Sequence, residues 1–317
     1  LTATTVAGNS VTVPVSTATI GTYTYTLISV QDGSSTACSQ AQAGSATVVV
    51  NPLPTASIAG TIAVCQNAAS PNITFTGANT VAPYTFVYTI NGGPNQTVTT
   101  TVGNSVTVAV PTAVVGTFTY TLVSVQDGTA TACSQAQTGN AVVTVNPLPT
   151  GAISGSKLVC INSASPDITF TAASGTAPYT FTYTINGGAP QVISTTGANT
   201  SVTLPASTAV AGVFTYKLVS VRDGSSTACV QAMNVADVVI DVSNVFPNTN
   251  FSFTNSVCIP NALVQFQNLS NIANGTPLTY SWNFGDGSPL SAALNPSHKY
   301  NFVGPFNVLL RATSNAG

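Results

Sequence analysis

Apolar and polar residues alternate in one stretch that occurs three times along the chain. The copies are GTYTYTLISVQDGSSTAC at 21–38, GTFTYTLVSVQDGTATAC at 116–133 and GVFTYKLVSVRDGSSTAC at 212–229. Because successive side chains of a β-strand point to opposite faces, this alternation predicts a strand with one buried face. Each copy continues into Asp-Gly, which favours a turn, and ends on a cysteine.

The alternation changes phase after Leu122. Phe118, Tyr120 and Leu122 share one parity, whereas Val123 and Val125 have the other. A β-bulge would explain the change, and so would a strand end that is buried on both faces. Either explanation leaves this stretch as one strand, around which the rest of the repeat is organised.

The spacing of the copies corresponds to one small domain. The cysteines that end them are 133 − 38 = 95 and 229 − 133 = 96 residues apart. This period is too long for a solenoid unit and fits one β-domain per repeat. The sequence VNPLPT separates repeats at 50–55 and again at 145–150, and its two prolines predict a strand end followed by a short, stiff linker.

Short strands with turn signals between them account for the rest of each repeat. Asn91-Gly92-Gly93 is a hairpin signal, and no segment has a helical period. This pattern is typical of an immunoglobulin-like antiparallel β-sandwich, so we predict an all-β chain built as a tandem array of such sandwiches. The expected strands are 72–77, 83–90, 96–100, 105–110, 118–125 and 141–145, and then 167–172, 178–185, 201–206, 214–221 and 237–242.

Four domains are expected from these boundaries. Residues 1–51 correspond to the C-terminal half of a repeat, because TVAGNSVTVPV near the start matches TVGNSVTVAV in the next copy. Residues 52–146 and 147–244 are full repeats, and 245–317 form a different domain whose last strand is expected beyond Gly317. The sequence is therefore expected to be a piece of a longer chain.

The composition excludes several classes of function. Only 4% of residues are charged, against a usual ~25%, and the net charge is −2. Such a chain has no basic surface for nucleic acid. No apolar stretch is long enough to span a membrane. The abundance of Val, Thr and Tyr indicates folded β-structure rather than disorder.

The six cysteines indicate an oxidising, extracellular setting. None forms a C-x-x-C pair, and a single histidine cannot complete a zinc finger, so neither a metal site nor a cofactor is expected. Calcium needs clustered carboxylates, whereas Asp32, Asp127 and Asp223 are about one repeat apart and each precedes a turn glycine. Disulfides are the natural role for cysteines at repeated positions.

Two pairing schemes remain open. We predict one bond within each full repeat, Cys65–Cys133 and Cys160–Cys229, which leaves Cys38 and Cys258 for partners outside the sequence. A simple sandwich places the two cysteines of one domain near opposite ends, unless its first strand crosses between the sheets. The alternative bridges domains through Cys38–Cys65, Cys133–Cys160 and Cys229–Cys258.

The last domain resembles a polycystic-kidney-disease (PKD) domain, which is a β-sandwich. It has the Y-x-W-x-F-G-D-G motif of that family, followed by a P-x-H-x-Y…G-x-x-x-V-x-L continuation. The resemblance implies a structural role for the motif, including its histidine, the only one in the chain. The matching residues are Tyr280, Trp282, Phe284, Gly285, Asp286, Gly287, Pro296, His298, Tyr300, Gly304, Val308 and Leu310.

The upstream repeats resemble the SprB-type repeats of Bacteroidota gliding adhesins. The shared order is a cysteine, an APYTF-like strand at 82–86, a GTFTY-like strand at 116–120 and a second cysteine. This chain departs from the family in its longer repeat and in Tyr88, where the family often has Trp. The resemblance implies a giant surface adhesin of tandem domains, exported by type 9 secretion.

These observations favour a non-catalytic, structural and adhesive stalk at the cell surface. No nucleophile–base pair and no phosphate-binding loop is present in the sequence. The expected partners are neighbouring domains of the same chain and the secretion machinery, with surface glycans and other adhesin or filament subunits as candidates. Two alternatives are a subunit of a homopolymeric fibre assembled by strand addition and the carbohydrate-binding accessory region of a secreted enzyme.

Overall fold

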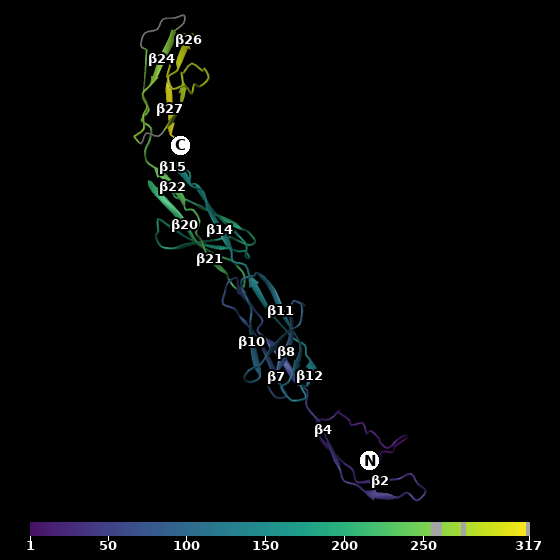
Figure 1. Ribbon diagram of the computed structural model, residues 1–317. Coiled ribbons are helices and arrows are strands. Elements are labelled where there is room, and N and C mark those ends of the chain that lie inside the picture. Colours follow the sequence, from purple (N-terminus) through teal and green to yellow (C-terminus); the bar gives the residue numbers. More distant parts are fainter. Residues whose placement is uncertain (255–261, 274–276, 315–317) are drawn as a thin grey trace. The chain divides into compact units, whose positions relative to one another are not determined.

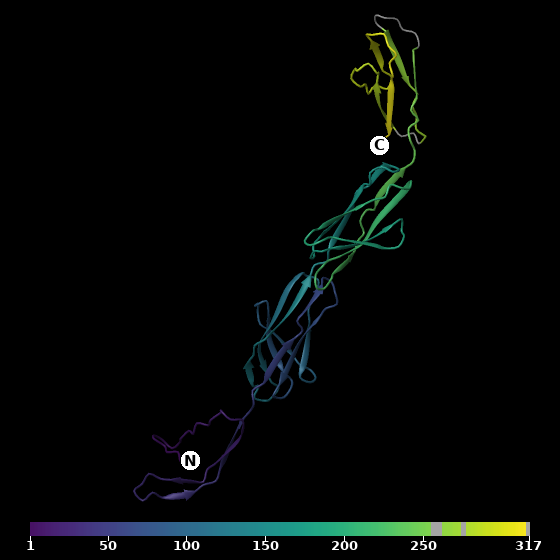
Figure 2. The same ribbon diagram turned by 180° about the vertical axis from the view of Figure 1, so that it is seen from behind.

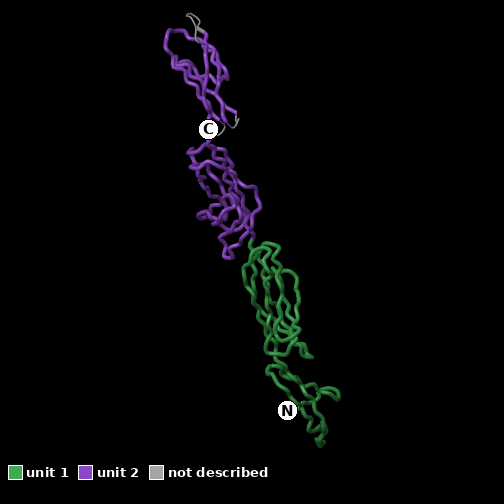
Figure 3. The backbone as a smooth tube through the Cα atoms, turned by 90° about the vertical axis from the view of Figure 1, so that its left-hand side faces the viewer, with its two compact units in different colours: residues 1–146 green, residues 147–317 purple. Residues whose placement is uncertain are grey.

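The computed structural model describes residues 1–254, 262–273 and 277–314. Every regular element in these residues is a β-strand, so the prediction of an all-β chain is confirmed. The chain divides into two compact units, residues 1–146 and 147–317 (Figure 3). Figures 1 and 2 show the strands of each unit from opposite sides.

The first unit begins with a half-sheet. Strand β1 (Gly21–Thr26) pairs antiparallel with β4 (Ser45–Val50), and β2 (Ser29–Gln31) pairs with β3 (Ser39–Ala41). Residues 1–20 contain no strand. The repeated stretch therefore forms its strand here as predicted, but β1 has a neighbour on one side only.

The rest of the first unit is a two-sheet sandwich. Its smaller sheet has the order β10-β7-β5. Its larger sheet has the order β6-β13-β11-β8-β9, and β12 pairs with the end of β11. The strands are β5 (Thr55–Ala59), β6 (Ile62–Cys65), β7 (Asn72–Ala78), β8 (Thr85–Ile90), β9 (Gln96–Thr99), β10 (Ser105–Ala109), β11 (Gly116–Gln126), β12 (Ser134–Ala136) and β13 (Asn140–Asn146).

The second unit begins with a sandwich of the same topology. Its sheets have the orders β14-β16-β19 and β15-β22-β20-β17-β18, and β21 pairs with the end of β20. The strands are β14 (Thr150–Ser154), β15 (Lys157–Cys160), β16 (Asp167–Ala173), β17 (Thr180–Ile185), β18 (Gln191–Ser194), β19 (Ser201–Pro205), β20 (Gly212–Arg222), β21 (Val230–Ala232) and β22 (Val238–Ser243).

The first strand of each sandwich crosses from one sheet to the other. In the first sandwich β5 belongs to the smaller sheet, whereas β6 pairs with β13 in the larger one. Gly60 lies at the crossing with φ +119°, and a Cβ there would come within 2.4 Å of the Asn72 carbonyl oxygen. The β6–β13 pair at this edge is parallel, whereas the other strand pairs of the sandwich are antiparallel.

The predicted irregularity in the central strand is a β-bulge. The register of β11 against β8 shifts between Leu122 and Ser124. Leu122 and Val125 are consequently both buried, although they have opposite parity. The second sandwich has the equivalent shift, because Thr182 and Tyr183 of β17 pair with Ser220 and Leu218 of β20 and Val219 is the extra residue.

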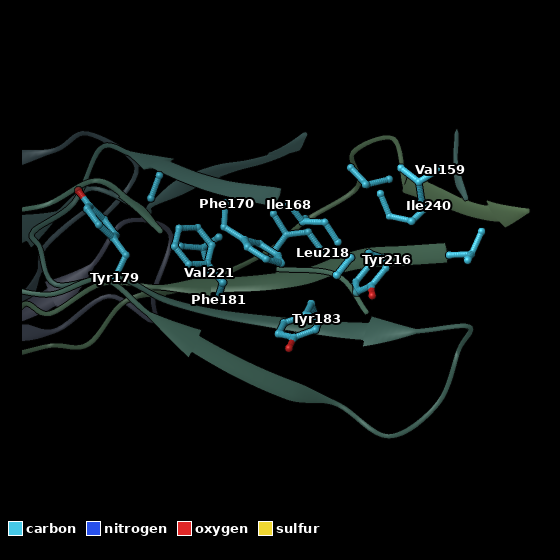
Figure 4. Packing of buried hydrophobic residues seen from close by; sticks show 14 residues of the cluster. Val159, Ile168, Phe170, Tyr179, Phe181, Tyr183, Tyr216, Leu218, Val221 and Ile240 are labelled. Atoms are coloured by element: carbon cyan, nitrogen blue, oxygen red, sulfur yellow. The ribbon is translucent and has the colours of Figure 1, made fainter. Parts of the chain in front are cut away.

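Each sandwich has a core built by both sheets. In the second one, Phe170 of β16 faces Phe181 of β17 with ring centroids 5.6 Å apart (Figure 4). Both side chains are fully buried. The alternation that predicted the strands thus supplies the residues that hold the two sheets together.

The second unit ends with two smaller sheets. One has the order β23-β24-β26 and the other pairs β25 with β27. Trp282 is fully buried between aromatic neighbours, including Phe251 and Phe266. The strands are β23 (Phe251–Phe253), β24 (Ala262–Asn268), β25 (Leu278–Asn283), β26 (Ser297–Tyr300) and β27 (Leu309–Ser314).

Candidate functional site

A loop that ends in a cysteine follows the central strand of every repeat. In the first sandwich, Asp127 Oδ1 accepts hydrogen bonds from the Thr129 hydroxyl (2.7 Å) and from the Cys133 amide (3.0 Å). The Asp127 amide in turn donates to the Cys133 carbonyl at 3.0 Å. The aspartate therefore caps its own turn, and it fixes both backbone groups of the cysteine.

The same contacts occur in the other two copies. Asp32 Oδ1 accepts from the Cys38 amide at 3.0 Å, and Asp223 Oδ1 accepts from the Cys229 amide at 2.8 Å. Hydrogen bonds from Ser34 lower the pKa of the Asp32 carboxyl below its ordinary value of 3.8. The same hydrogen-bonded loop thus occurs three times. The residues that form it lie within one short sequence, Asp-Gly-Ser/Thr-x-Thr-Ala-Cys.

The glycine of this loop packs against a second repeated motif. Gly128 donates its amide to the Val81 carbonyl at 3.0 Å. A Cβ on Gly128 would come within 2.4 Å of Pro83 Cδ and 2.6 Å of Pro83 N. Gly224 has the same relation to Pro178. The Asp-Gly turn and the Ala-Pro-Tyr motif are therefore parts of one contact, which the linear sequence does not show.

The strand register separates the two cysteines of each sandwich. Cys65 pairs with Asn146 at the end of β13, close to Gly116 at the start of β11. Cys133 precedes Ser134, which pairs with Gln126 at the other end of β11. Because 126 − 116 = 10 residues of strand lie between these positions, the two cysteines are about 33 Å apart.

Both predicted bonds within sandwiches were wrong. The Cα atoms of a disulfide lie no more than about 7 Å apart, so the register forbids Cys65–Cys133. Cys133 is a free thiol, whereas Cys65 is disulfide-bonded. In the second sandwich Cys160 lies beside Ser243 and Cys229 follows the far end of β20, so the same geometry forbids Cys160–Cys229. The first strand does cross between sheets, but it runs parallel to β13 and keeps Cys65 at the distant end.

The alternative scheme also disagrees with the structure. It requires Cys38 and Cys133 to be bonded, and both are free thiols. Its third bond involves Cys258, which lies outside the described residues. Cys229 is disulfide-bonded.

A residue of the VNPLPT linker contacts the cysteine loop. Asn51, directly after β4, donates its side-chain amide to the Thr131 hydroxyl at 2.8 Å. The hydroxyl oxygen of Thr131 in turn lies 3.4 Å from the sulfur of Cys133. The sequence carries a weak signal for it, because both residue types recur in the next repeat. Asn146 corresponds to Asn51, and Thr227 corresponds to Thr131.

The histidine of the PKD-like motif forms a hydrogen bond with an aspartate at a turn. His298 Nε2 lies 2.7 Å from Asp286 Oδ2, and the ring stacks on Phe284 with centroids 4.0 Å apart. The Tyr300 ring meets the His298 ring edge to face, with centroids 4.7 Å apart. Gly285 has φ +78°, and a Cβ there would meet Asn307 backbone atoms. His298 thus packs between residues of its own motif, Phe284 and Tyr300.

Asp286 makes the stability of this segment depend on pH. Hydrogen bonding from Ser288, followed by that from His298, lowers the pKa of the Asp286 carboxyl from 3.8 to about 2. A carboxyl whose pKa is lower in the folded state stabilises the fold above its unfolded-state pKa, and the contribution is lost as the pH falls to the folded-state value. We expect Asp286→Asn to lower the free energy of unfolding by about 1 kcal/mol at pH 5–7, a value reduced for partial solvent exposure.

The measurement is urea unfolding followed by fluorescence of Trp282, the only tryptophan in the sequence. The difference between wild type and Asp286→Asn should shrink between about pH 4 and pH 2. Asp237→Asn, which changes an exposed carboxylate in the preceding sandwich, should leave the Trp282 transition unchanged. A gap that stays constant down to pH 2 would contradict the prediction.

The described residues were also searched for metal sites, pockets and membrane-spanning helices. They contain no group of three His, Cys, Asp or Glu side chains that could hold a metal ion. A shallow depression of about 380 Å³ lies between β23 and β24, lined by Phe253, Gln265 and neighbouring residues. No helix in the described part of the chain is long and apolar enough to cross a membrane.

Comparison with protein families identifies the last segment. Residues 244–317 match the PKD domain. The match covers the segment that carries Trp282, Asp286 and His298, so the PKD resemblance is confirmed there. No curated protein matches the chain.

Comparison with solved structures returns several bacterial adhesins among its matches. A Ca²⁺-stabilized adhesin that helps an Antarctic bacterium reach out and bind ice has 13% identity and a TM-score of 0.39, with 91% of this chain and 73% of that chain covered. A 1.5-MDa bacterial ice-binding adhesin has 11% identity and a TM-score of 0.37, with coverage of 84% and 88%. A tetra-tandem repeat from the extending region of a large adhesion protein has 17% identity and a TM-score of 0.25, with coverage of 92% and 73%. At these identities the likeness concerns the fold alone.

Proposed function

We propose that this chain is a non-catalytic stalk segment of a large adhesin, displayed outside the cell at its surface. The observation that carries the proposal is the contact of Asn51 with Thr131, because it ties the Asn-Pro-Leu-Pro linker to the next sandwich. A linker fixed in this way gives successive domains a defined joint instead of a flexible tether. The domains of the proposal are 1–51, 52–146, 147–244 and 245–317.

The proposal has a finer form, which rests on the sequence resemblance. In this form the stalk belongs to a Bacteroidota gliding adhesin exported by type 9 secretion. Its partners are neighbouring domains of the same chain, with surface glycans or other filament subunits at the ends of the stalk. The joint at 244–245 differs from the others, since Ser243 occupies the position of Asn51 and Asn146 and the NPLP sequence is absent.

Small-angle X-ray scattering with sedimentation velocity tests the stalk. Each sandwich is expected to add roughly 35 Å, so a monomer longer than about 100 Å supports the proposal. A compact particle would contradict it. Growth of the particle with protein concentration would instead favour a fibre subunit assembled by strand addition, and binding on a glycan array would favour a carbohydrate-binding accessory.

Native trypsin digestion should leave the stalk intact. All five basic residues lie in strands, where paired backbone resists cleavage; they are Lys157, Lys217, Arg222, Lys299 and Arg311. With so few charges to screen, the melting temperature should change by less than about 3 °C between 10 mM and 1 M NaCl. Gel electrophoresis and calorimetry measure the two effects. Rapid cleavage of the native chain, or a larger shift in melting temperature, would show that the few charges matter more than we expect.

A further inference from the structure

The larger sheet of the first sandwich has a broad outer face made mostly of threonine. Five strands lie side by side in this sheet, in the order β6-β13-β11-β8-β9. Because side chains alternate between the two faces of a strand, the neighbours of the buried Phe86, Tyr120 and Val143 point away from the core. We call this surface the threonine face, and the residues at its centre are Val87, Thr89, Thr119, Thr121, Val142 and Thr144.

The threonine face presents methyl groups together with hydroxyls that find partners within the sheet. Thr121 of β11 lies between Thr89 of β8 and Asn140 of β13 in the strand ladder. Near the edge of the face, the hydroxyls of Thr85 and Thr99 hydrogen-bond to each other at 2.9 Å. A surface laid on such a face removes methyl groups from water, while a hydroxyl bonded across two strands keeps its partner.

The first sandwich exposes no charged side chain. Among residues 52–146, all of which the structure describes, Asp127 is the only charged residue, and it is 5% exposed. Net charge is a main reason why folded proteins repel one another and stay monomeric. Two copies of this sandwich therefore meet without that repulsion, and no ion loses its hydration when their faces touch.

The second sandwich has the same sheet, but its outer face is charged. Lys217 and Arg222 of β20 are exposed. They occupy the positions of Thr121 and Gln126, because 217 − 121 = 96 and 222 − 126 = 96. Lys217 pairs with β17 just as Thr121 pairs with β8. The fold accepts charge at these positions, so packing within the sandwich does not require the threonine face to be neutral.

We propose that the threonine face binds the threonine face of a second copy of this chain. A two-fold pair uses the same surface on both copies, and an uncharged surface is compatible with itself. Two sheets that pack face to face in this way lie about 10 Å apart, with their strands roughly aligned. The central residues of the face include no aromatic ring, so the stacking contact by which sugars are commonly bound is not offered there.

The size of the threonine face fits a weak, reversible pair. Five strands spaced ~4.8 Å apart give a width of roughly 24 Å, and about six residues per strand give a length of roughly 20 Å. The pair then buries about 1,000 Å² in total, which is the low end for a specific interface. The smaller sheet has only the three strands β10-β7-β5 and offers less area.

This pairing goes beyond the proposed stalk function. It concerns the first sandwich alone and holds whether or not the chain is a stalk. For a stalk it supplies a lateral contact between neighbouring molecules, which adds to whatever the ends of the stalk bind.

Sedimentation equilibrium of the intact, oxidised chain tests the pairing. Accessible thiols are alkylated first, so that no intermolecular disulfide contributes. The mass should rise from one chain to two between about 1 and 300 μM, and it should stop at two. Because no ion pair holds the copies together, the dissociation constant should change less than about threefold between 10 mM and 1 M NaCl. A chain that stays monomeric over this range would overturn the proposal.

Charge substitutions locate the interface. Thr121→Lys introduces on the threonine face the charge that Lys217 already provides in the second sandwich, and it should weaken pairing at least about tenfold, because like charges then face each other across the interface. Thr121→Lys combined with Gln126→Arg should abolish pairing. Thr107→Lys is the matched control, since Thr107 is exposed on β10 of the smaller sheet, and it should leave the dissociation constant unchanged within about twofold.

Two outcomes with these variants would overturn the assignment to this face. One is pairing that persists in the double variant, and the other is an equal loss in Thr107→Lys and Thr121→Lys. Thermal melting shows that each variant is folded. If Thr121→Lys does not fold, Gln126→Arg alone, at an exposed position, should still weaken pairing by about threefold or more.

The pairing and the stalk can fail separately. Solution scattering from the monomeric double variant measures the length of a single chain, so an elongated particle supports the stalk even if the wild type does not pair. A wild-type mass that grows beyond two chains would indicate a fibre subunit assembled by strand addition, and it would contradict the face-to-face pair.

Discussion

Replacement of Gly128 by alanine is expected to lower the free energy of unfolding of the first sandwich by about 3 kcal/mol. The added methyl group would lie 2.4 Å from Pro83 Cδ and 2.6 Å from Pro83 N. Neither atom can withdraw by a rotamer change, because both belong to the proline ring and one is a backbone atom. The turn or the Ala82-Pro83 segment must then shift, and the Gly128–Val81 hydrogen bond is strained with it.

The chain contains a matched control for this substitution. Gly33 occupies the same position in the same loop of the half-sheet, and a Cβ there would meet nothing within 4 Å. Gly33→Ala should therefore change stability by less than about 0.5 kcal/mol. Hydrogen exchange measured by mass spectrometry on peptides from 72–126 reports the first effect, and peptides from 21–50 report the second. Equal protection in the two variants would show that the contact with Pro83 is unimportant.

The central strands could be predicted from the sequence because their signal is local. Phe118, Tyr120 and Leu122 alternate with threonines, and the structure buries Tyr120 and Leu122 in the core. The phase change at Val123 pointed to the bulge for the same reason. Such patterns depend only on which face of one strand is buried.

The course of the first strand could not be predicted in the same way. Residues 55–65, TASIAGTIAVC, alternate weakly and contain the crossing glycine Gly60. Their assignment to two sheets depends on β7 and β13, the second of which follows in sequence by about 80 residues. This pairing decides at which end of the sandwich Cys65 lies. The predicted pairing of the cysteines was therefore wrong, although the sequence shows their repeated spacing.

The cysteine loop was recognised only in part. The turn was predictable because Asp127 and Gly128 are typical turn residues. The left-handed Ala132 was not, since alanine has no preference for that conformation. The contact between Asn51 and Thr131 joins residues 80 positions apart and leaves no pattern within either segment.

Substitution of Phe266 by alanine should destabilise the PKD segment by about 3–5 kcal/mol. Phe266 is 3% exposed and lies at the centre of an aromatic cluster, with ring centroids 5.5 Å from Trp282 and 5.4 Å from Phe284. Removal of its ring leaves a cavity that these rigid neighbours cannot fill by rotation. The loss is comparable with the whole stability of a small domain, so the segment is expected to be largely unfolded at 37 °C.

Urea titration followed by Trp282 fluorescence measures this effect without interference from the sandwiches, because the chain has a single tryptophan. Phe253→Ala provides the matched control, since Phe253 lies on the neighbouring strand but is 54% exposed, and we expect a loss below about 1 kcal/mol. If Phe266→Ala gives no folded baseline, Phe266→Leu should shift the midpoint by a smaller, measurable amount of about 1–2 kcal/mol. Comparable losses at Phe253 and Phe266 would mean that the aromatic cluster is not the core that holds this segment together.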